Sequence, residues 1–148
     1  MNFYGVGVKW DRTNDKLPDY LTYGFWCMGY WSNERPVYDE LIQSIRTGDV
    51  VFAKSYVPEQ HDKLYIRAIG FVSDKEIPNK LPEEYSGKCG FSVNWTTLFE
   101  PHIILEPTPD FMPNGFMKEV GNLRTRTIFR ETNDTMLLKI IKLMNGPY

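Results

Sequence analysis

The sequence contains few of the residues from which catalytic and metal sites are usually built. Its 148 residues include only two histidines, His61 and His102, and only two cysteines, Cys27 and Cys89. None of them has zinc-site spacing, and the chain has no phosphate-binding glycine loop or nucleophile motif. We therefore expect a protein that is not an enzyme and needs no metal or cofactor. We also expect both cysteines to be reduced thiols in a cytoplasmic protein.

Long apolar runs and an excess of one charge are also missing. No segment approaches the length of a transmembrane helix, and the first residues lack the basic start and apolar run of a signal peptide. We expect no membrane partner. The 17 basic and 19 acidic residues leave a net charge of −2. This balance argues against a dedicated duplex-binding protein but is compatible with a local basic strip.

The composition that remains is that of a globular protein. Hydrophobic residues make up 42% of the chain and aromatic residues 15%, far from a disordered composition. A chain of this length can bury a core without disulfides or metal. We expect a single domain spanning residues 1–148.

Hydrophobic patterns predict several short strands and two helices. A capped amphipathic helix is expected at Pro36–Arg46, where Pro36 suits the first turn and Gly48 a stop. A second is expected at Asn133–Met144. Strands are expected at 2–9, 49–55, 64–73 with a bend at Gly70, 91–95, 102–105 and 124–130, and loops at 10–24 and in the aromatic segment 25–33. Five or six short curved strands with two helices predict an α+β fold built on a partly open barrel.

One part of the sequence resembles a known superfamily. Trp31-Ser32-Asn33, the helix that follows, the Gly48-Asp49 turn and the segments VVFAKS and RAIGFV together resemble the PUA-like superfamily. Its nearest members are EVE domains, YTH domains and the N-terminal domains of McrB-type restriction proteins. The resemblance covers roughly residues 3–130. It implies a PUA-like (EVE-like) curved, partly open β-barrel of about five or six strands, flanked by two or more helices.

The resemblance also implies a binding site. Domains of this superfamily hold a flipped, often methylated base between aromatic side chains, and stacking returns about 1–3 kcal/mol per base. The positions that match such a pocket are Trp31, Ser32, Asn33 and Ser55, and we add Lys54, Trp26 and Trp95 as further ligand-binding residues. Each tryptophan has an alternative interpretation as a core residue. Ser32 or Asn33 has an alternative role as a helix cap.

Three arginines near the end of the chain suggest contacts with a nucleic-acid backbone. Arg124, Arg126 and Arg130 share one face of the expected strand at 124–130. Arginine matches phosphate oxygens well, so we assign Arg124 and Arg126 to phosphate contacts. The alternative is an exposed edge strand protected by charge.

These observations predict a non-catalytic binding domain and leave three functions open. The first is a reader of modified DNA or RNA, acting alone or with a partner nuclease or other effector protein. The second is a sensor or sequestering protein for a free nucleotide-type small molecule. The third is a protein-interaction or inhibitor module on the same scaffold. The sequence does not rank the ligands.

Overall fold

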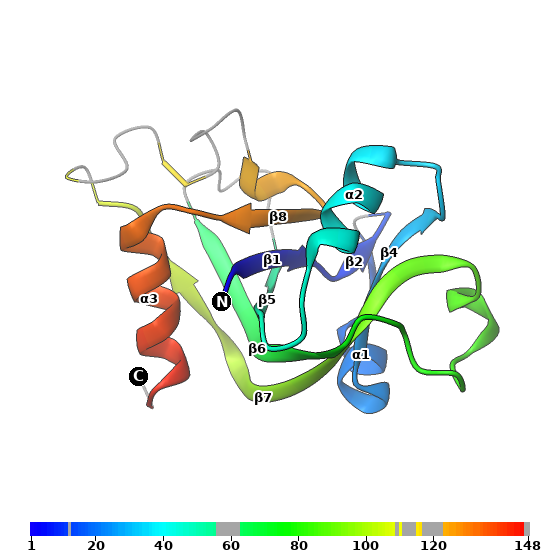
Figure 1. Ribbon diagram of the computed structural model, residues 1–148. Helices are drawn as coiled ribbons and strands as arrows, with labels where there is room; N and C mark the ends of the chain where they lie inside the picture. Colours follow the sequence, from blue (N-terminus) through cyan, green and yellow to red (C-terminus); the bar gives the residue numbers. More distant parts are fainter. Residues whose placement is uncertain (12, 56–62, 109, 111–114, 117–122, 147–148) are drawn as a thin grey trace.

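The computed structural model describes residues 1–11, 13–55, 63–108, 110, 115–116 and 123–146. A curled six-stranded sheet forms the centre of this structure (Figure 1). Its strands are β1 (Phe3–Gly7), β4 (Phe25–Trp31), β5 (Val50–Ser55), β6 (Leu64–Asp74), β7 (Lys88–Leu105) and β8 (Ile128–Glu131). They lie in the order β4-β7-β6-β5-β1-β8, with β1 and β5 parallel and all other neighbours antiparallel.

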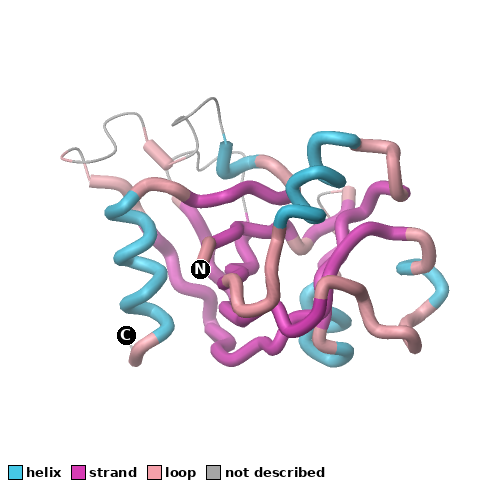
Figure 2. Tube along the Cα trace, in the orientation of Figure 1, coloured by secondary structure: helices cyan, strands magenta, loops and turns pink. Residues whose placement is uncertain are grey.

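Helices lie at the two ends of the sheet (Figure 2). Their bounds are α1 (Leu17–Tyr23), α2 (Pro36–Ser44) and α3 (Asp134–Met144), with short 3-10 turns η1 (Glu83–Tyr85) and η2 (Leu123–Thr125). Helix α3 covers one end, while α1 and α2 lie at the other (Figure 1). A two-stranded ladder of β2 (Lys9–Trp10) and β3 (Asn14–Asp15) completes the described elements. The expected α+β, partly open barrel is confirmed.

Both faces of the sheet are buried, each in its own hydrophobic cluster. Along β5, Val51 and Ala53 join the cluster that packs against α1 and α2. Val50 and Phe52 join the cluster that packs against α3. Successive strand residues point to opposite faces, so β5 is apolar on both sides. The candidate site described below lies at the α1 and α2 end.

The sheet curls where its longest strands change register. The β6–β7 pairing shifts at three places, between Ile66 and Ala68, between Ile69 and Gly70, and between Val72 and Asp74. A Cβ on Gly70 would lie 2.5 Å from the carbonyl oxygen of Asn94, so the two backbones meet closely there. Bulges of this kind bend a strand and increase its twist. The predicted bend at Gly70 is confirmed.

Both predicted helices are confirmed, with small differences at their ends. Helix α2 ends at Ser44 because Ile45 takes an extended backbone and buries its side chain in the core. Helix α3 begins after Asn133, whose side chain accepts a hydrogen bond from the backbone N–H of Met136. That contact satisfies one of the free N–H groups at the helix start.

Several expected segments differ from the structure in kind or in extent. The aromatic segment expected as a loop forms β4 as far as Trp31. The first four residues of this strand are all buried, so no alternation of apolar and polar residues marks it in the sequence. The loop expected at 10–24 contains α1, a helix too short for a periodic pattern. Strand is confirmed at 91–95 and 102–105, but both ranges are parts of one longer strand, β7. The strand expected from Arg124 begins at Ile128, after η2.

In the described part of the chain, no helix combines the length and the apolar character needed to span a membrane.

Candidate functional site

Two tryptophans and a lysine lie together at the end of β4, and we call this group the aromatic face (Trp10, Trp31 and Lys88). Trp31 is exposed, whereas Trp10 and Lys88 are partly buried. The Trp31 side chain is 58% exposed, an unusual state for so large an apolar group. The Lys88 ammonium lies 3.6 Å from the centroid of the Trp31 ring and 5.5 Å from that of Trp10. A cation held this close to two indole rings is attracted to their electron-rich faces.

Glycines and strand pairing make room for the aromatic face. Trp31 pairs with Lys88 across β4 and β7, after an irregularity in the ladder that follows Cys27. A Cβ on Gly29 would lie 3.3 Å from the Trp10 ring, and one on Gly87 would lie 3.2 Å from the Trp31 ring. Gly87 also has a φ of 74°, which disfavours a larger residue. Larger residues at these positions would push the two rings away.

Two lysines contact the rings of the aromatic face, and they differ in how they are held. The Lys88 ammonium donates to the carbonyl oxygen of Gly29 at 3.1 Å, and no carboxylate among the described residues pairs with it. Lys16 lies 4.6 Å from the Trp10 centroid but also forms a 2.6 Å ion pair with Glu84. Lys88 is therefore the cation that is freer to change partners.

A polar loop adjoins the aromatic face and connects β4 to α2. The backbone N–H of Asn33 donates to Oδ2 of Asp39 at 2.8 Å, and Asn33 has a left-handed φ of 70°. The Ser32 hydroxyl lies 3.8 Å from the sulfur of Cys89. Burial raises the pKa of the Cys89 thiol, the Ser32 contact opposes this, and a hydrogen bond to Asp39 together with the negative charge of Asp39 raises it further. Asp39, Ser32 and Cys89 are thus close neighbours.

The two other tryptophans proposed as pocket walls pack into the protein. Trp26 is fully buried, donates from Nε1 to the carbonyl oxygen of Gly7 at 2.8 Å, and packs on Phe91. Trp95 is half-buried and donates from Nε1 to the carbonyl oxygen of Tyr20 at 3.1 Å. Both contacts fit the alternative interpretation of these rings as core residues. Their assignment as pocket walls stays a prediction.

Lys54 and Ser55 lie at the end of β5. Lys54 is buried, and its ammonium donates to the carbonyl oxygen of Arg126 at 2.7 Å. Burial lowers the pKa of Lys54 to about 7, because the interior disfavours the charged form. The Ser55 hydroxyl is also buried, without a hydrogen-bond partner among the described residues. A ligand-binding role for either residue stays a prediction.

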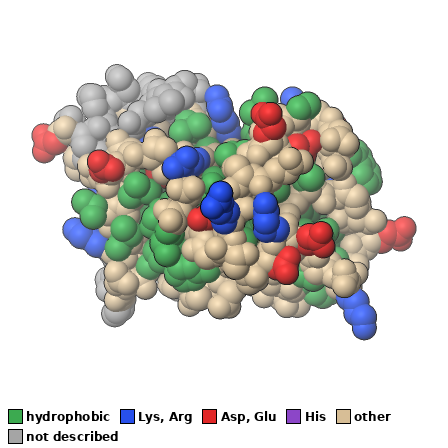
Figure 3. Space-filling view, viewed as in Figure 1, with side chains coloured by type: hydrophobic (Ala, Val, Ile, Leu, Met, Phe, Trp, Pro, Cys, Tyr) green, Lys and Arg blue, Asp and Glu red, His purple; other side chains and the backbone are tan. Residues whose placement is uncertain are grey.

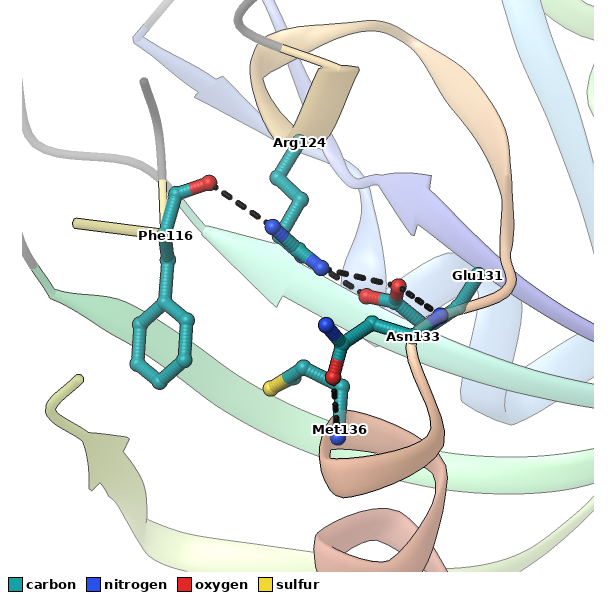
Figure 4. Close-up of polar contacts among 5 residues, drawn as sticks. All are labelled: Phe116, Arg124, Glu131, Asn133 and Met136. Atoms are coloured by element: carbon teal, nitrogen blue, oxygen red, sulfur yellow. Dashed lines mark hydrogen bonds and ion pairs between the residues drawn. The ribbon is translucent and has the colours of Figure 1, made fainter. Parts of the chain in front are cut away.

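The two arginines assigned to phosphate contacts have very different surroundings. Arg124 is 1% exposed, binds both carboxylate oxygens of Glu131 at 2.7 and 2.8 Å, and donates to the carbonyl oxygen of Phe116 (Figure 4). Glu131 also accepts from the backbone N–H of Asn133, the cap of α3. Arg124 would have to leave this network to reach a phosphate. The side chain of Arg126 is exposed, so its phosphate role stays a prediction.

Charge on the surface is mixed. On the face drawn in Figure 3, Lys and Arg side chains lie among Asp and Glu side chains and do not merge into one basic surface. Within the described ranges, no group of three or more His, Cys, Asp or Glu side chains is close enough to hold a metal ion.

Sequence reasoning missed three residues of this site. Trp10 and Lys88 come from segments distant from Trp31 in the chain, and only the fold brings them beside it. Asp39 carried a visible signal, since an acidic residue in the first turn of a helix often reaches back to the preceding loop. Its contact with Asn33 follows that pattern.

Comparisons with known proteins bear on the fold. No family model matches the sequence, and no curated protein matches it either. The structure is similar to the YTH domain of the MRB1 protein of Zygosaccharomyces rouxii, solved in complex with N6-methyladenosine RNA. The TM-score is 0.55 at 15% sequence identity, and the match covers 100% of this chain and 87% of that chain. At this identity the likeness shows a fold related to that of a YTH domain. Membership of the PUA-like superfamily, and of its EVE or McrB kinds, stays a prediction.

Proposed function

We propose that this chain is a binding domain that holds a modified base of RNA against Trp31. The observation that carries the proposal is the exposed indole of Trp31, with a cation over its face, on a fold similar to that of a YTH domain. A flipped base costs a few kcal/mol to extrude, and stacking on an aromatic ring returns about 1–3 kcal/mol. The exposed ring is therefore a suitable platform for such a base.

Lys88 has a defined part in this proposal. Its ammonium lies where a stacked base would lie, 3.6 Å from the Trp31 ring centroid. A base that stacks there displaces the ammonium, which has no carboxylate to hold it among the described residues. The displaced lysine then meets the negative phosphates on either side of the base. In this proposal the RNA contacts both the Trp31 ring and the Lys88 ammonium.

The proposal describes recognition without bond-making chemistry. It gives the protein a modified-RNA ligand, and it leaves the next step to an effector such as a partner nuclease. Its specificity for a methylated base would come from apolar contacts of the methyl group, which add less than about 1 kcal/mol. Stacking and phosphate contacts would supply the rest of the affinity.

The test is a binding assay with end-labelled single-stranded RNA. One strand carries a single N6-methyladenosine, and a matched strand carries adenosine. We expect wild type to prefer the methylated strand, and Trp31→Ala to weaken its binding about tenfold, because the stacking contact is lost. Fluorescence anisotropy of the label measures this without relying on tryptophan emission.

Leu138→Ala provides the matched control, since Leu138 is also 58% exposed but lies on α3 at the other end of the sheet. It should bind as wild type does. If Trp31→Ala binds the methylated strand with unchanged affinity, the base does not stack on Trp31 and the proposal is wrong.

A further inference from the structure

The turn between η2 and β8 carries an exposed arginine on a well-bonded backbone. Arg126 and Thr127 form this turn, and Arg126 is exposed. The backbone N–H of Arg126 donates to the carbonyl oxygen of Leu123 at 3.2 Å. The backbone N–H of Gly7 donates to the carbonyl oxygen of Thr127 at 2.8 Å. In a surface turn, water can satisfy such groups, but here the protein itself does so.

The two remaining backbone groups of the turn bond to side chains from other elements. The amine of Lys54 donates to the carbonyl oxygen of Arg126 at 2.7 Å. The backbone N–H of Thr127 donates to the Tyr38 hydroxyl at 3.4 Å. Lys54 comes from the end of β5, and Tyr38 comes from α2. The backbone that bears the Arg126 side chain is therefore fixed by segments that are distant in the sequence.

Lys54 makes its contact with the turn at an energetic cost. The residue is 4% exposed, and its amine lies 3.9 Å from the position that a Cβ on Gly7 would take. Burial lowers the pKa of Lys54 to about 7, so the position suits a charge poorly. An apolar side chain of the same length would fill the space without this cost. What the lysine adds is the hydrogen bond to the carbonyl oxygen of Arg126.

Contacts through α2 connect the turn with the end of β4 that carries Trp31. Helix α2 lies beside the start of β8 (Figure 1). Tyr38 of α2, which accepts from Thr127, stacks on Tyr30 with ring centroids 6.1 Å apart. Tyr30 directly precedes Trp31 in β4. The turn and the proposed stacking ring are thus held on one continuous set of contacts.

We propose that Lys54 is a positioning residue that holds Arg126 ready for an RNA phosphate. The inference rests on the proposed function and on the phosphate contact predicted for Arg126. Arginine loses much side-chain freedom when it binds, and a backbone that is fixed beforehand reduces the total loss. Lys54 remains in the interior and acts only through Arg126. It needs no access to solvent or to RNA.

The test removes the amine and keeps the length of the side chain. Lys54→Met, Arg126→Ala and the double variant bind the end-labelled strand with N6-methyladenosine across a series of salt concentrations. We expect Lys54→Met to bind about threefold to tenfold more weakly at low salt. Its slope of log affinity against log salt concentration should fall by about 0.7, as in Arg126→Ala. The double variant should bind no more weakly than Arg126→Ala, because the two residues act as one unit.

Lys142→Met is the matched control, because it makes the same substitution at an exposed lysine of α3. It should keep the affinity and the slope of wild type. Urea unfolding at the pH of the binding assay reports on the fold. Lys54→Met should be at least as stable as wild type, because an apolar side chain replaces a buried amine. If Lys54→Met does not fold, the lysine serves the fold itself and the inference is overturned.

The remaining outcomes separate this inference from the proposed function. An unchanged slope in Lys54→Met, or losses that add in the double variant, overturns the positioning role of Lys54. A slope that falls further in the double variant than in Arg126→Ala shows that Lys54 contacts a phosphate itself, which also overturns it. An unchanged slope in Arg126→Ala overturns the inference and leaves stacking on Trp31 intact. Failure of wild type to bind the strand overturns the proposed function itself.

Discussion

At the scale of single residues, Lys54 shows what burial does to a charge. Its ammonium has one backbone acceptor, the carbonyl oxygen of Arg126, and it lies 5.8 Å from the ring centroid of Phe129. No carboxylate among the described residues pairs with it. The pKa of Lys54 falls to about 7 because burial penalises the charged form. The folded protein therefore favours neutral lysine at a pH where the unfolded chain holds the proton.

This difference predicts how stability depends on pH. Between about pH 7 and the ordinary lysine pKa of 10.5, the unfolded state binds more protons than the folded state. The free energy of unfolding should therefore rise with pH in this window, as the penalty for burying the charge disappears. Lys54→Met removes the titrating group and should flatten this rise. Urea unfolding of both proteins from pH 6 to pH 9.5 measures the difference.

Other groups that titrate near the upper end of this pH range are present in both wild type and Lys54→Met. Burial raises the pKa of Cys27 to about 12 and also raises that of Tyr20, so neither contributes to the difference between wild type and Lys54→Met. A difference that stays constant across the range would contradict the low pKa of Lys54.

Arg124 illustrates what the sequence does not reveal about a charged residue. Its partner Glu131 lies seven residues away, a spacing without special meaning in a strand. A 3-10 turn at Arg124 and a strand that begins at Ile128 bring the two charges together inside the protein. A buried pair of this kind is costly to break from one side. The sequence alone offered no reason to prefer this pair over a phosphate.

At the scale of elements, helices with strong periodicity were predictable and short elements were not. Helix α3 combines a cap at Asn133 with an apolar stripe, and both signals are local. Helix α1 buries only Leu17 and Tyr20, too few positions for a pattern. Strand β4 lacks alternation because Phe25 to Met28 are all buried. Local patterns thus identify elements that have one exposed side.

The two sides of α3 should respond very differently to the same substitution. Ile140 is fully buried against the sheet, whereas Leu138 is 58% exposed. We expect Ile140→Ala to lower the free energy of unfolding by about 2–5 kcal/mol, because it leaves a cavity in the core. Leu138→Ala should change it by less than about 0.5 kcal/mol. Chemical denaturation of both variants gives the comparison, and similar losses would mean that α3 does not pack as described.

At the scale of the whole molecule, strand order and the site needed the structure. Strand β1 pairs with β5 in parallel and with β8 in the opposite direction, and these contacts join distant parts of the chain. No local pattern specifies such a choice. Trp31 was identified from the motif around it, but Trp10 and Lys88 reach it only through the fold. The sequence therefore predicted the class of fold and one central residue of the candidate site.

The net charge of −2 leads to a prediction about salt. If RNA is the ligand, binding should weaken as the salt concentration increases. Each lost phosphate contact should reduce the slope of log affinity against log salt concentration by about 0.7. Arg126→Ala should show this reduction, whereas Lys142→Ala, on the exposed side of α3, should not. Affinities measured across a salt series give the slopes. An unchanged slope in Arg126→Ala would remove this arginine from the phosphate contacts.

The same series distinguishes RNA from a free nucleotide as the ligand. The acidic balance of the chain is the observation that favours the smaller ligand. A single nucleotide should bind with a shallow salt dependence, and RNA should then compete poorly with it. Failure of both ligands to bind would favour a protein-interaction module.

The cation over Trp31 also affects how copies of this protein meet one another. An exposed indole favours contacts with other apolar groups, and exposed apolar surface promotes self-association. Lys88 places a charge over one face of the exposed ring, 3.6 Å from its centroid. Two copies that approach through this surface bring like charges together, which keeps them apart. A ligand that replaces the ammonium over Trp31 would therefore also remove a charge that opposes contact between two copies through this surface.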